Sequence, residues 1–333
     1  MLQVVPTVPA EARCKLIGTH DGTFHIDEIL AIAMLTQLSA NKDSTIVRTR
    51  CPEQLAMCEL RVDVGGKDDP ETGDFDHHQR GFARVMAKYN CSTKLSSAGL
   101  VYAALGPEII RTILDSDLDS AALTALCKYA YTDFVESIDG NDNGVEPFSG
   151  SRRYVVSTDL PSRIQSLNGA WNGDRSPEAQ NAAFAKAVEI VRQEFAEFVT
   201  RAFAAWWPAR AEISEALNAA KHYQSDGRIV VLGRYCPYDM HLYELEEEGS
   251  IAGRTWIVLY EDVSSNTWRI KTVATEPSGF QPRCELPLAW AGLKGQELEE
   301  ACGVEGAVFV HNGRFIGAGT SKAAALAMAR KAC

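Results

Sequence analysis

The stretch that decides the fold is KLIGTHDGTFHIDEILAIAMLTQL, residues 15–38. Residues 15–18 predict a short strand that ends at a glycine, and residues 19–26 predict a loop. Asp27 stands where a helix N-cap belongs, and the residues after it are apolar nearly all round, which is typical of a buried crossover helix. A strand, a loop and a buried helix in this order predict the first part of an α/β domain.

Two further strands are expected downstream, and they define the kind of sheet. Residues 44–50 are rich in β-branched side chains, and residues 60–64 (LRVDV) are stopped by two glycines. Strands that alternate with helices predict a parallel sheet with right-handed crossovers. Residues 96–105 and 107–138 predict the next helices. Ligand sites in such sheets form outside the carboxyl ends of the strands.

The second half of the chain has a different pattern. Residues 147–177 are rich in Pro, Gly, Ser and Asn, which predicts an extended loop or lid. Residues 176–222 predict a long helical stretch that is interrupted at residues 206–208, where a proline occurs. Strand-like segments and a final alanine-rich helix follow at residues 228–232, 254–260, 268–273, 307–310 and 320–331.

Together these patterns predict an α/β fold with two domains. Residues 1–150 are expected to form a parallel-sheet domain that carries the chemistry. Residues 151–225 are expected to form a lid loop and connecting helices. Residues 226–333 are expected to form a second, smaller α/β domain with a mixed or antiparallel sheet.

Composition restricts the class of protein. The chain has 333 residues, of which 46% are hydrophobic and 23% are charged, as in a soluble globular protein of two domains. No apolar run reaches the roughly 18–20 residues that span a membrane, so we expect no membrane partner. The net charge of −11 argues against nucleic-acid binding over the whole surface, but it leaves a local basic groove open.

Cysteine usage and the N-terminus bear on the compartment. Nine cysteines without a CxxC pair predict reduced, mostly buried thiols and a reducing intracellular compartment. The N-terminal residues lack the features of a secretory signal and give little support to a mitochondrial transit peptide. Nucleus, mitochondrion and cytoplasm stay open at this point, and so does the oligomeric state.

Residues 19–78 hold most of the side chains that could bind metal. His20, His25 and Asp27 stand between the first strand and its helix, and Asp63 ends the strand at residues 60–64. Carboxylates and imidazoles are ligands for divalent ions such as Mg²⁺, Mn²⁺ and Zn²⁺. The alternative interpretations are a helix cap with two surface histidines for the first set, and a turn-forming aspartate for Asp63.

The triplet Asp76-His77-His78 is the most specific part of this pattern. Asp76 could orient a neighbouring histidine, while His77 binds metal and His78 faces a substrate. A polar surface loop explains the sequence DFDHHQR poorly. Asp139, in the sequence FVESIDGNDNG, could complete the site, with Asp142 or a plain turn as competing interpretations.

In this order along the chain, the residues resemble the DHH phosphoesterase superfamily, which includes RecJ-type exonucleases and family II inorganic pyrophosphatases. More closely, the segments THDGTFHIDE, DVGG, FDHHQRGF, SSAGLVY, DGNDNG and VFVHNGRFIGAG resemble the melanocyte-proliferating-gene (Myg) family. The resemblance runs from residue 19 to residue 319. It implies a DHH-type catalytic domain in residues 1–150, a substrate-binding domain in residues 226–333, and a 3′–5′ exonuclease acting on single-stranded RNA or short oligonucleotides.

The resemblance also implies a role for each candidate residue. One metal ion would be held by His20, His25 and Asp63. A second ion would be held by Asp27, Asp63, His77 and Asp139. His78, with Asp76 beside it, would act on the scissile phosphate. The superfamily usually has an aspartate where His25 stands, which favours Mn²⁺ over Mg²⁺. Two such ions share a water, lower its pKa and clamp the attacking and leaving oxygens.

Contacts to the substrate are expected near the end of the chain. The glycine-rich segment HNGRFIGAGTSK, residues 311–322, precedes a helix, and the N-terminus of a helix binds anions. We therefore predict phosphate contacts from His311, Arg314 or Lys322, with a plain hairpin around Asn-Gly as the alternative. Arg80, close to the triplet, is a further candidate.

Two other functions stay open on the sequence. One is a small-molecule phosphohydrolase that acts on pyrophosphate, a dinucleotide or a nucleotide, which the acidic net charge favours. The other is a non-catalytic metal-binding protein that works through a partner. The pair Trp206-Trp207 predicts a buried helix contact rather than a base-stacking surface.

Overall fold

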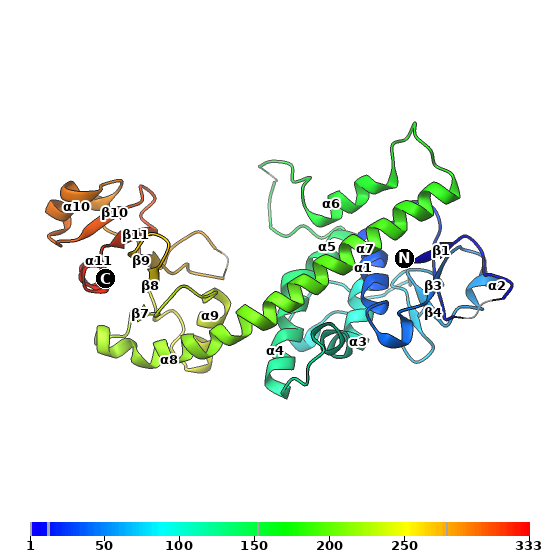
Figure 1. The fold of residues 1–333 in the computed structure, drawn as a ribbon, viewed down its shortest axis with the longest axis horizontal. Helices are drawn as coiled ribbons and strands as arrows, with labels where there is room; N and C mark the ends of the chain where they lie inside the picture. The colour runs from blue at the N-terminus through cyan, green and yellow to red at the C-terminus, as the bar shows by residue number, and fades with distance from the viewer. Residues whose placement is uncertain (1, 12–13, 152, 278) are drawn as a thin grey trace. The chain divides into compact units, whose positions relative to one another are not determined.

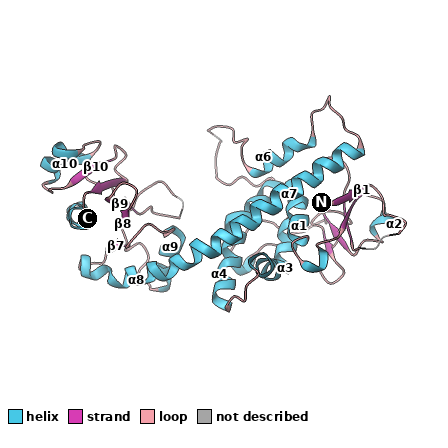
Figure 2. Ribbon diagram, in the orientation of Figure 1, coloured by secondary structure: helices cyan, strands magenta, loops and turns pink. Residues whose placement is uncertain are grey.

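The computed structural model describes residues 2–11, 14–151, 153–277 and 279–333. The chain forms two compact units, Met1–Phe203 and Ala204–Cys333, which are traced from blue to red in Figure 1. Each unit combines one sheet with several helices (Figure 2). The predicted α/β fold with two sheets is therefore confirmed.

The sheet of the first unit has the strand order β1-β3-β2-β4-β6-β5. Its strands are β1 (Gln3–Val5), β2 (Leu16–Thr19), β3 (Thr45–Arg48), β4 (Leu60–Val62), β5 (Asp68–Asp69) and β6 (Asp74–Phe75). Every neighbouring pair is parallel except β5 with β6, which is antiparallel. The carboxyl ends of β2, β4 and β6 therefore meet at one edge of the sheet.

The helices of the first unit begin with α1, which connects two parallel neighbours, β2 and β3. The helices are α1 (Ile26–Leu35), α2 (Pro52–Leu55), α3 (Ser97–Leu114), α4 (Ser120–Ala130), α5 (Glu136–Asp142), α6 (Leu160–Gln165) and α7 (Pro177–Arg201). All ten residues of α1 are buried, and α1 packs against α3 and α7. The buried crossover helix predicted from residues 27–38 is therefore confirmed.

Several local predictions need correction. The N-cap of α1 is His25, not Asp27, because the Glu28 side chain accepts a hydrogen bond from the backbone N–H of His25 at 2.9 Å. Helix α3 continues through Pro107, where the sequence predicts a break between two helices. Residues 147–177 are not wholly extended, since α6 lies within them.

The sheet of the second unit is smaller, with the order β10-β11-β9-β8-β7. Its strands are β7 (Ile229–Val231), β8 (Ile257–Asp262), β9 (Thr267–Thr272), β10 (Ala307–Val310) and β11 (Ile316–Gly319). Strand β7 pairs parallel with β8, and the other pairs are antiparallel, as expected for a mixed sheet. The helices are α8 (Trp207–Tyr223), α9 (Asp239–Glu248), α10 (Gly295–Cys302) and α11 (Lys322–Ala332).

The two faces of this sheet are covered differently. On one face, Ile257 and Ile270 pack with residues of α10 and α11, such as Met328. On the other face, Val230 and Val258 pack with residues of α8 and α9. Because side chains alternate along a strand, Arg269 and Lys271 of β9 lie on the face opposite to Ile270.

The interruption predicted in the long helical stretch is a π-helical turn. Helix α7 ends at Arg201, and the turn Ala202–Trp206 leads directly into α8. The Trp206 side chain is buried and stacks on His241 with a centroid distance of 4.2 Å, as the predicted helix contact requires. Among the described residues, the structure contains no helix with the length and apolarity that a membrane span needs.

Candidate metal centre

The candidate residues converge at one edge of the first sheet. His20 directly follows β2, Asp63 directly follows β4, and Asp76-His77-His78 directly follows β6. These three strands are neighbours and run parallel. The sheet topology thus brings together residues that lie up to 58 positions apart in the sequence, from 20 to 78.

Within the described part of the chain, ligand-type atoms that lie within 4.8 Å of one another form three overlapping groups. The groups are His20, His25, Glu28 and Asp63; Asp63, His77 and His78; and His25, Asp27 and Asp142. Asp63 and His25 each belong to two groups, so the three groups make up one continuous cluster. We call these eight residues the acidic–histidine cluster.

Asp63 is the hub of the cluster. Its carboxylate lies 3.4 Å from His20 Nε2, 3.4 Å from His77 Nε2 and 3.2 Å from His78 Nδ1. Ser97 at the start of α3 donates a hydrogen bond to it at 3.0 Å. Although the carboxyl is buried, these contacts hold its pKa far below the usual range. The backbone φ of Asp63 is 56°, a left-handed conformation that costs a non-glycine residue about 1 kcal/mol or more.

Asp27 lies on α1 with its side chain fully buried. Neither of its carboxylate oxygens has a hydrogen-bond partner among the described residues. Burial, and then the charge of Asp63, raise the pKa of Asp27 well above its usual range. A buried carboxylate without a partner is costly, and a bound cation would remove that cost.

Glu28 is a member that the sequence reasoning missed. It is buried, and its Oε1 lies 3.0 Å from His20 Nε2. The same side chain caps α1 at His25. The spacing His25-x-x-Glu28 is that of a capping box, so reading His25 rather than Asp27 as the N-cap would have pointed to Glu28.

The structure places Asp142, not Asp139, in the cluster. An Asp142 oxygen lies 3.2 Å from His77 Nε2. Asp139 is instead used inside the protein: its carboxylate accepts hydrogen bonds from Ser96, Gly99 and Tyr131. These bonds cap the first turn of α3 and occupy both oxygens. The structure therefore groups Asp142, the competing interpretation, with the other candidate residues, and the choice of ligand between the two stays a prediction.

His78 is held at the edge of the cluster. Its Nδ1 lies 2.9 Å from Asp76 Oδ1, and its side chain is 64% exposed. Asp76 is buried, and it also accepts a hydrogen bond from the backbone of Gly66. Asp63, despite the partial burial of the ring, raises the pKa of His78 to about 9. Asp76 thus fixes one ring nitrogen of His78 and leaves the other for an outside group.

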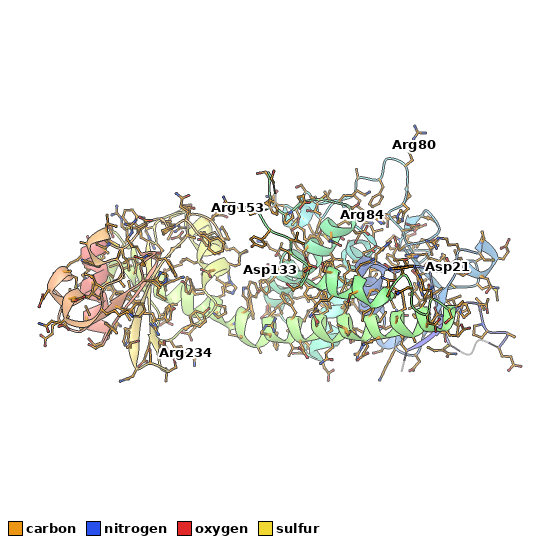
Figure 3. The ribbon with its side chains drawn as sticks, turned by 90° about the horizontal axis from the view of Figure 1, so that it is seen from above. Asp21, Arg80, Arg84, Asp133, Arg153 and Arg234 are labelled. Atoms are coloured by element: carbon orange, nitrogen blue, oxygen red, sulfur yellow. The ribbon has the colours of Figure 1, made fainter. Side chains whose placement is uncertain are left out.

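A pocket of about 660 Å³ adjoins the cluster and includes His20, Asp63 and His78 in its lining. Its basic residues are already paired, as Arg61 is with Asp74 and Lys67 with Asp69. Arg80 does not line this pocket; its exposed side chain points away from the body of the first unit (Figure 3).

The other predicted substrate residues lie in the second unit. His311 and Arg314 belong to the hairpin between β10 and β11, and Lys322 begins α11. Arg314 is paired with Glu285, and Lys322 donates to the Tyr223 hydroxyl at 3.2 Å. The hairpin alternative is therefore present, and phosphate contact by these residues stays a prediction.

The donor set fits divalent cations. Buried carboxylates and imidazoles face one another, and neither the two Asp27 oxygens nor His77 Nδ1 has a hydrogen-bond partner among the described residues. Oxygen and imidazole ligands in one cluster suit Mn²⁺, Mg²⁺ and related ions. Without cations, the proximity of Asp27, Asp63 and Asp142 would be repulsive.

The fold and the cluster thus define an α/β protein with a candidate metal centre at the carboxyl edge of a parallel sheet. A model of the MYG1 exonuclease family, described as uncharacterised protein family UPF0160, matches residues 16–333. The chain therefore belongs to this family, in agreement with the closer of the two resemblances.

Three relatives illustrate the similarity. The human protein named MYG1 exonuclease is 40% identical over 333 residues, which cover 97% of this chain and 88% of its own. The rat protein of the same name is 40% identical and covers 94% of this chain and 83% of its own. The Dictyostelium discoideum protein named MYG1 protein is 37% identical, and the match covers 95% of each chain.

Proposed function

We propose that this chain is a metal-dependent phosphodiesterase of the DHH type that shortens single-stranded RNA or short oligonucleotides from the 3′ end. The observation that carries the proposal is Asp27, a fully buried carboxylate without a hydrogen-bond partner among the described residues, in a cluster with Asp63 and Asp142. The human and rat relatives are named exonucleases, which supports a nuclease.

The proposed ligands are the buried members of the cluster together with the half-buried Asp142 and the exposed His25. They are His20, His25, Asp27, Glu28, Asp63, His77 and Asp142. Two divalent ions, with Mn²⁺ favoured because of the imidazoles, would lower the pKa of water and neutralise charge on the phosphate oxygens. Asp63 lies against ligands on both sides, so it is the residue that would be shared.

The remaining chemistry falls to His78 and Asp76. Asp76 holds Nδ1 of His78, which turns the other ring nitrogen toward the exposed side. A protonated His78 there would donate to a phosphate oxygen and orient the substrate. Its raised pKa, about 9, would keep the ring charged at neutral pH.

A small-molecule phosphohydrolase is a second candidate, because the pocket of about 660 Å³ beside the cluster has the size of a small-ligand site. A dinucleotide or nucleotide would fit this class. We also place the protein in a reducing compartment, a proposal supported by its nine cysteines, none of which forms a disulfide.

The test is hydrolysis of a 5′-labelled single-stranded RNA by metal-stripped protein, with Mn²⁺, Mg²⁺ or no metal added back. We expect a Mn²⁺-dependent ladder that shortens from the 3′ end, and no ladder from Asp63→Asn. Equal turnover of a dinucleotide and a long RNA would favour the small-molecule candidate. Normal RNA turnover by Asp63→Asn would refute the metal assignment.

A further inference from the structure

One face of the second sheet carries aromatic and cationic side chains in a single row. Tyr260 of β8 is paired with Arg269 of β9, Arg269 with Ala318 of β11, and Ala318 with Phe309 of β10. Because Ala318 has a small side chain, Arg269 reaches across it to the Phe309 ring, with a distance of 5.4 Å to the centroid. The row therefore crosses four neighbouring strands.

A second pair lies beside this row. Lys271 is on the same face of β9 as Arg269, and its Nζ lies 4.5 Å from the centroid of the Phe315 ring. Phe315 is exposed and also contacts the His311 ring, at a centroid distance of 4.7 Å. Helix α8 packs against β7, at the far edge of the sheet. The half-buried Phe309 ring and the exposed Phe315 ring thus lie over the part of the sheet made by β9, β10 and β11.

The loop after β7 extends this surface. Tyr235 is 61% exposed, and its ring lies 5.2 Å from that of Tyr260. Its neighbour Arg234 is exposed, and its side chain projects from the second unit (Figure 3). We define the aromatic–cationic face as Tyr235, Tyr260, Arg269, Lys271, Phe309 and Phe315.

The charged side chains on this face indicate which kind of partner it binds. Asp262 pairs with Arg269, and Asp239 interacts electrostatically with Lys271. Lys271 has no ion pair or hydrogen bond to a described residue, and its ammonium lies over the Phe315 ring. A chain with 44 acidic and 33 basic residues thus gathers cations and flat rings on one sheet face. Single-stranded nucleic acids bind such surfaces, with bases on the rings and phosphates on the cations.

We infer that the aromatic–cationic face binds the body of a single-stranded oligonucleotide, away from the bond that is cut. The inference deepens the proposed function and rests on it for the choice of RNA. Bases stack on exposed rings such as Phe315 and Tyr235, and Lys271 contacts the backbone phosphate between them. Affinity is then largely independent of base sequence, since every base offers a flat face.

The test is the binding of a fluorescein-labelled oligouridine of about 12 nucleotides to the full chain in excess chelator, followed by fluorescence anisotropy. The double variant Lys271→Gln/Phe315→Ala is expected to lose about 10-fold to 100-fold in affinity. Lys271→Gln alone is expected to reduce the slope of log affinity against log salt by about 0.7. Phe315→Tyr, which keeps the ring, is expected to retain wild-type affinity.

The matched control is Lys221→Gln/Phe280→Ala, which removes an exposed lysine and an exposed phenylalanine elsewhere in the second unit. Equal affinity of the test and control variants overturns the inference. The inference is also overturned if the wild-type protein does not bind the oligomer. It is overturned as well if light scattering shows that the substitutions in this face only dissociate a dimer.

The two proposals fail in different ways. If the oligomer binds through this face but is not hydrolysed, the proposed nuclease function is overturned and the inferred RNA binding by the face is supported. Conversely, if the double variant hydrolyses RNA with an unchanged KM, only the inference that this face binds RNA is overturned. Hydrolysis of bis(p-nitrophenyl) phosphate, which has neither a nucleobase nor a nucleotide chain for this face to bind, is expected to be equal in all these variants.

Discussion

Asn168 holds the backbone of Phe24 at both polar groups. The Phe24 N–H donates to Asn168 Oδ1, and Asn168 Nδ2 donates to the Phe24 carbonyl oxygen, each at 2.9 Å. Phe24 is buried and directly precedes His25 in the loop that begins with His20. A residue from the turn after α6 thus fixes the loop that supplies two candidate metal ligands, although the two positions are 144 apart in sequence.

Asn168→Ala is expected to loosen this loop. The change leaves a buried N–H and a carbonyl oxygen of Phe24 without partners, which destabilises the fold by about 1–3 kcal/mol. Mn²⁺ affinity should fall as well, because the ligand loop must be ordered on binding. Urea unfolding and titration calorimetry check the two effects. Asn218→Ala, on the exposed side of α8, is the control and should leave both unchanged; a metal affinity equal to wild type in Asn168→Ala would contradict the positioning role.

Substitutions of Asp139 and Asp142 are expected to have different effects, the first on the stability of the fold and the second on metal binding. Asp139→Ala should lower the free energy of unfolding by about 1–3 kcal/mol, because Ser96, Gly99 and Tyr131 lose their acceptor. Asp142→Asn should weaken Mn²⁺ binding yet stabilise the metal-free protein, because it relieves repulsion with Asp27 and Asp63. Metal content and urea unfolding of both variants decide this; the reverse pattern would restore Asp139 as the ligand.

His78→Ala is expected to lower turnover and leave the bound metal largely in place. The side chain is 64% exposed and one of its nitrogens is held by Asp76, so it lies at the rim rather than the centre of the cluster. A loss of about 10²-fold to 10³-fold in kcat is typical when one hydrogen-bond donor to the developing charge is removed. Metal analysis beside the kinetics is the check, and equal loss of metal and activity would make His78 a ligand.

His20 gives the metal-free protein a defined pH dependence. Burial lowers the pKa of His20, but hydrogen bonds with Asp63 and Glu28 outweigh it and raise the pKa from 6.5 to about 10. The protonated ring therefore stabilises the fold fully below pH 6.5, and this contribution is lost as the pH rises toward 10. Urea unfolding in chelator across this range should show the loss, and His20→Gln should flatten the curve. A curve equally steep in the variant would show that another group is responsible.

The hydrophobic pattern of the sequence was enough to predict the elements that are buried on all sides. Helix α1 and strands β2 and β3, whose residues are all buried, are built around apolar and β-branched residues whose stable place is the interior. The two-residue strands β5 and β6 carry Asp68, Asp69 and Asp74, and such short polar segments have no periodicity. Pro107 continues a helix because the buried contacts of α3 outweigh a missing backbone hydrogen bond.

The types of residue at the candidate site could be predicted from the sequence, but which of these residues contact one another could be predicted less well. Residues at strand ends could be grouped from the sequence because parallel strands share an edge. Asp139 and Asp142 share one face of α5 about one turn apart, so which of them reaches the cluster depends on where the helix packs along its axis. Hydrogen bonds from Tyr131 and α3 to Asp139 fix that position. Asn168 gives no signal in the sequence, since its role depends on where residues 166–168 pack.

The left-handed backbone at Asp63 is a cost in stability that the fold bears in order to keep a carboxylate at the hub of the cluster. Glycine would adopt a φ of 56° without steric strain, and it would also remove one of the crowded acidic groups. The relief of backbone strain would be opposed by the loss of the Asp63 contacts to Ser97, His20 and His77, so the same residue strains the backbone and connects three strand ends. Directed evolution that accepts glycine at this position would lose the hub of the site, and it must therefore screen for metal retention in parallel.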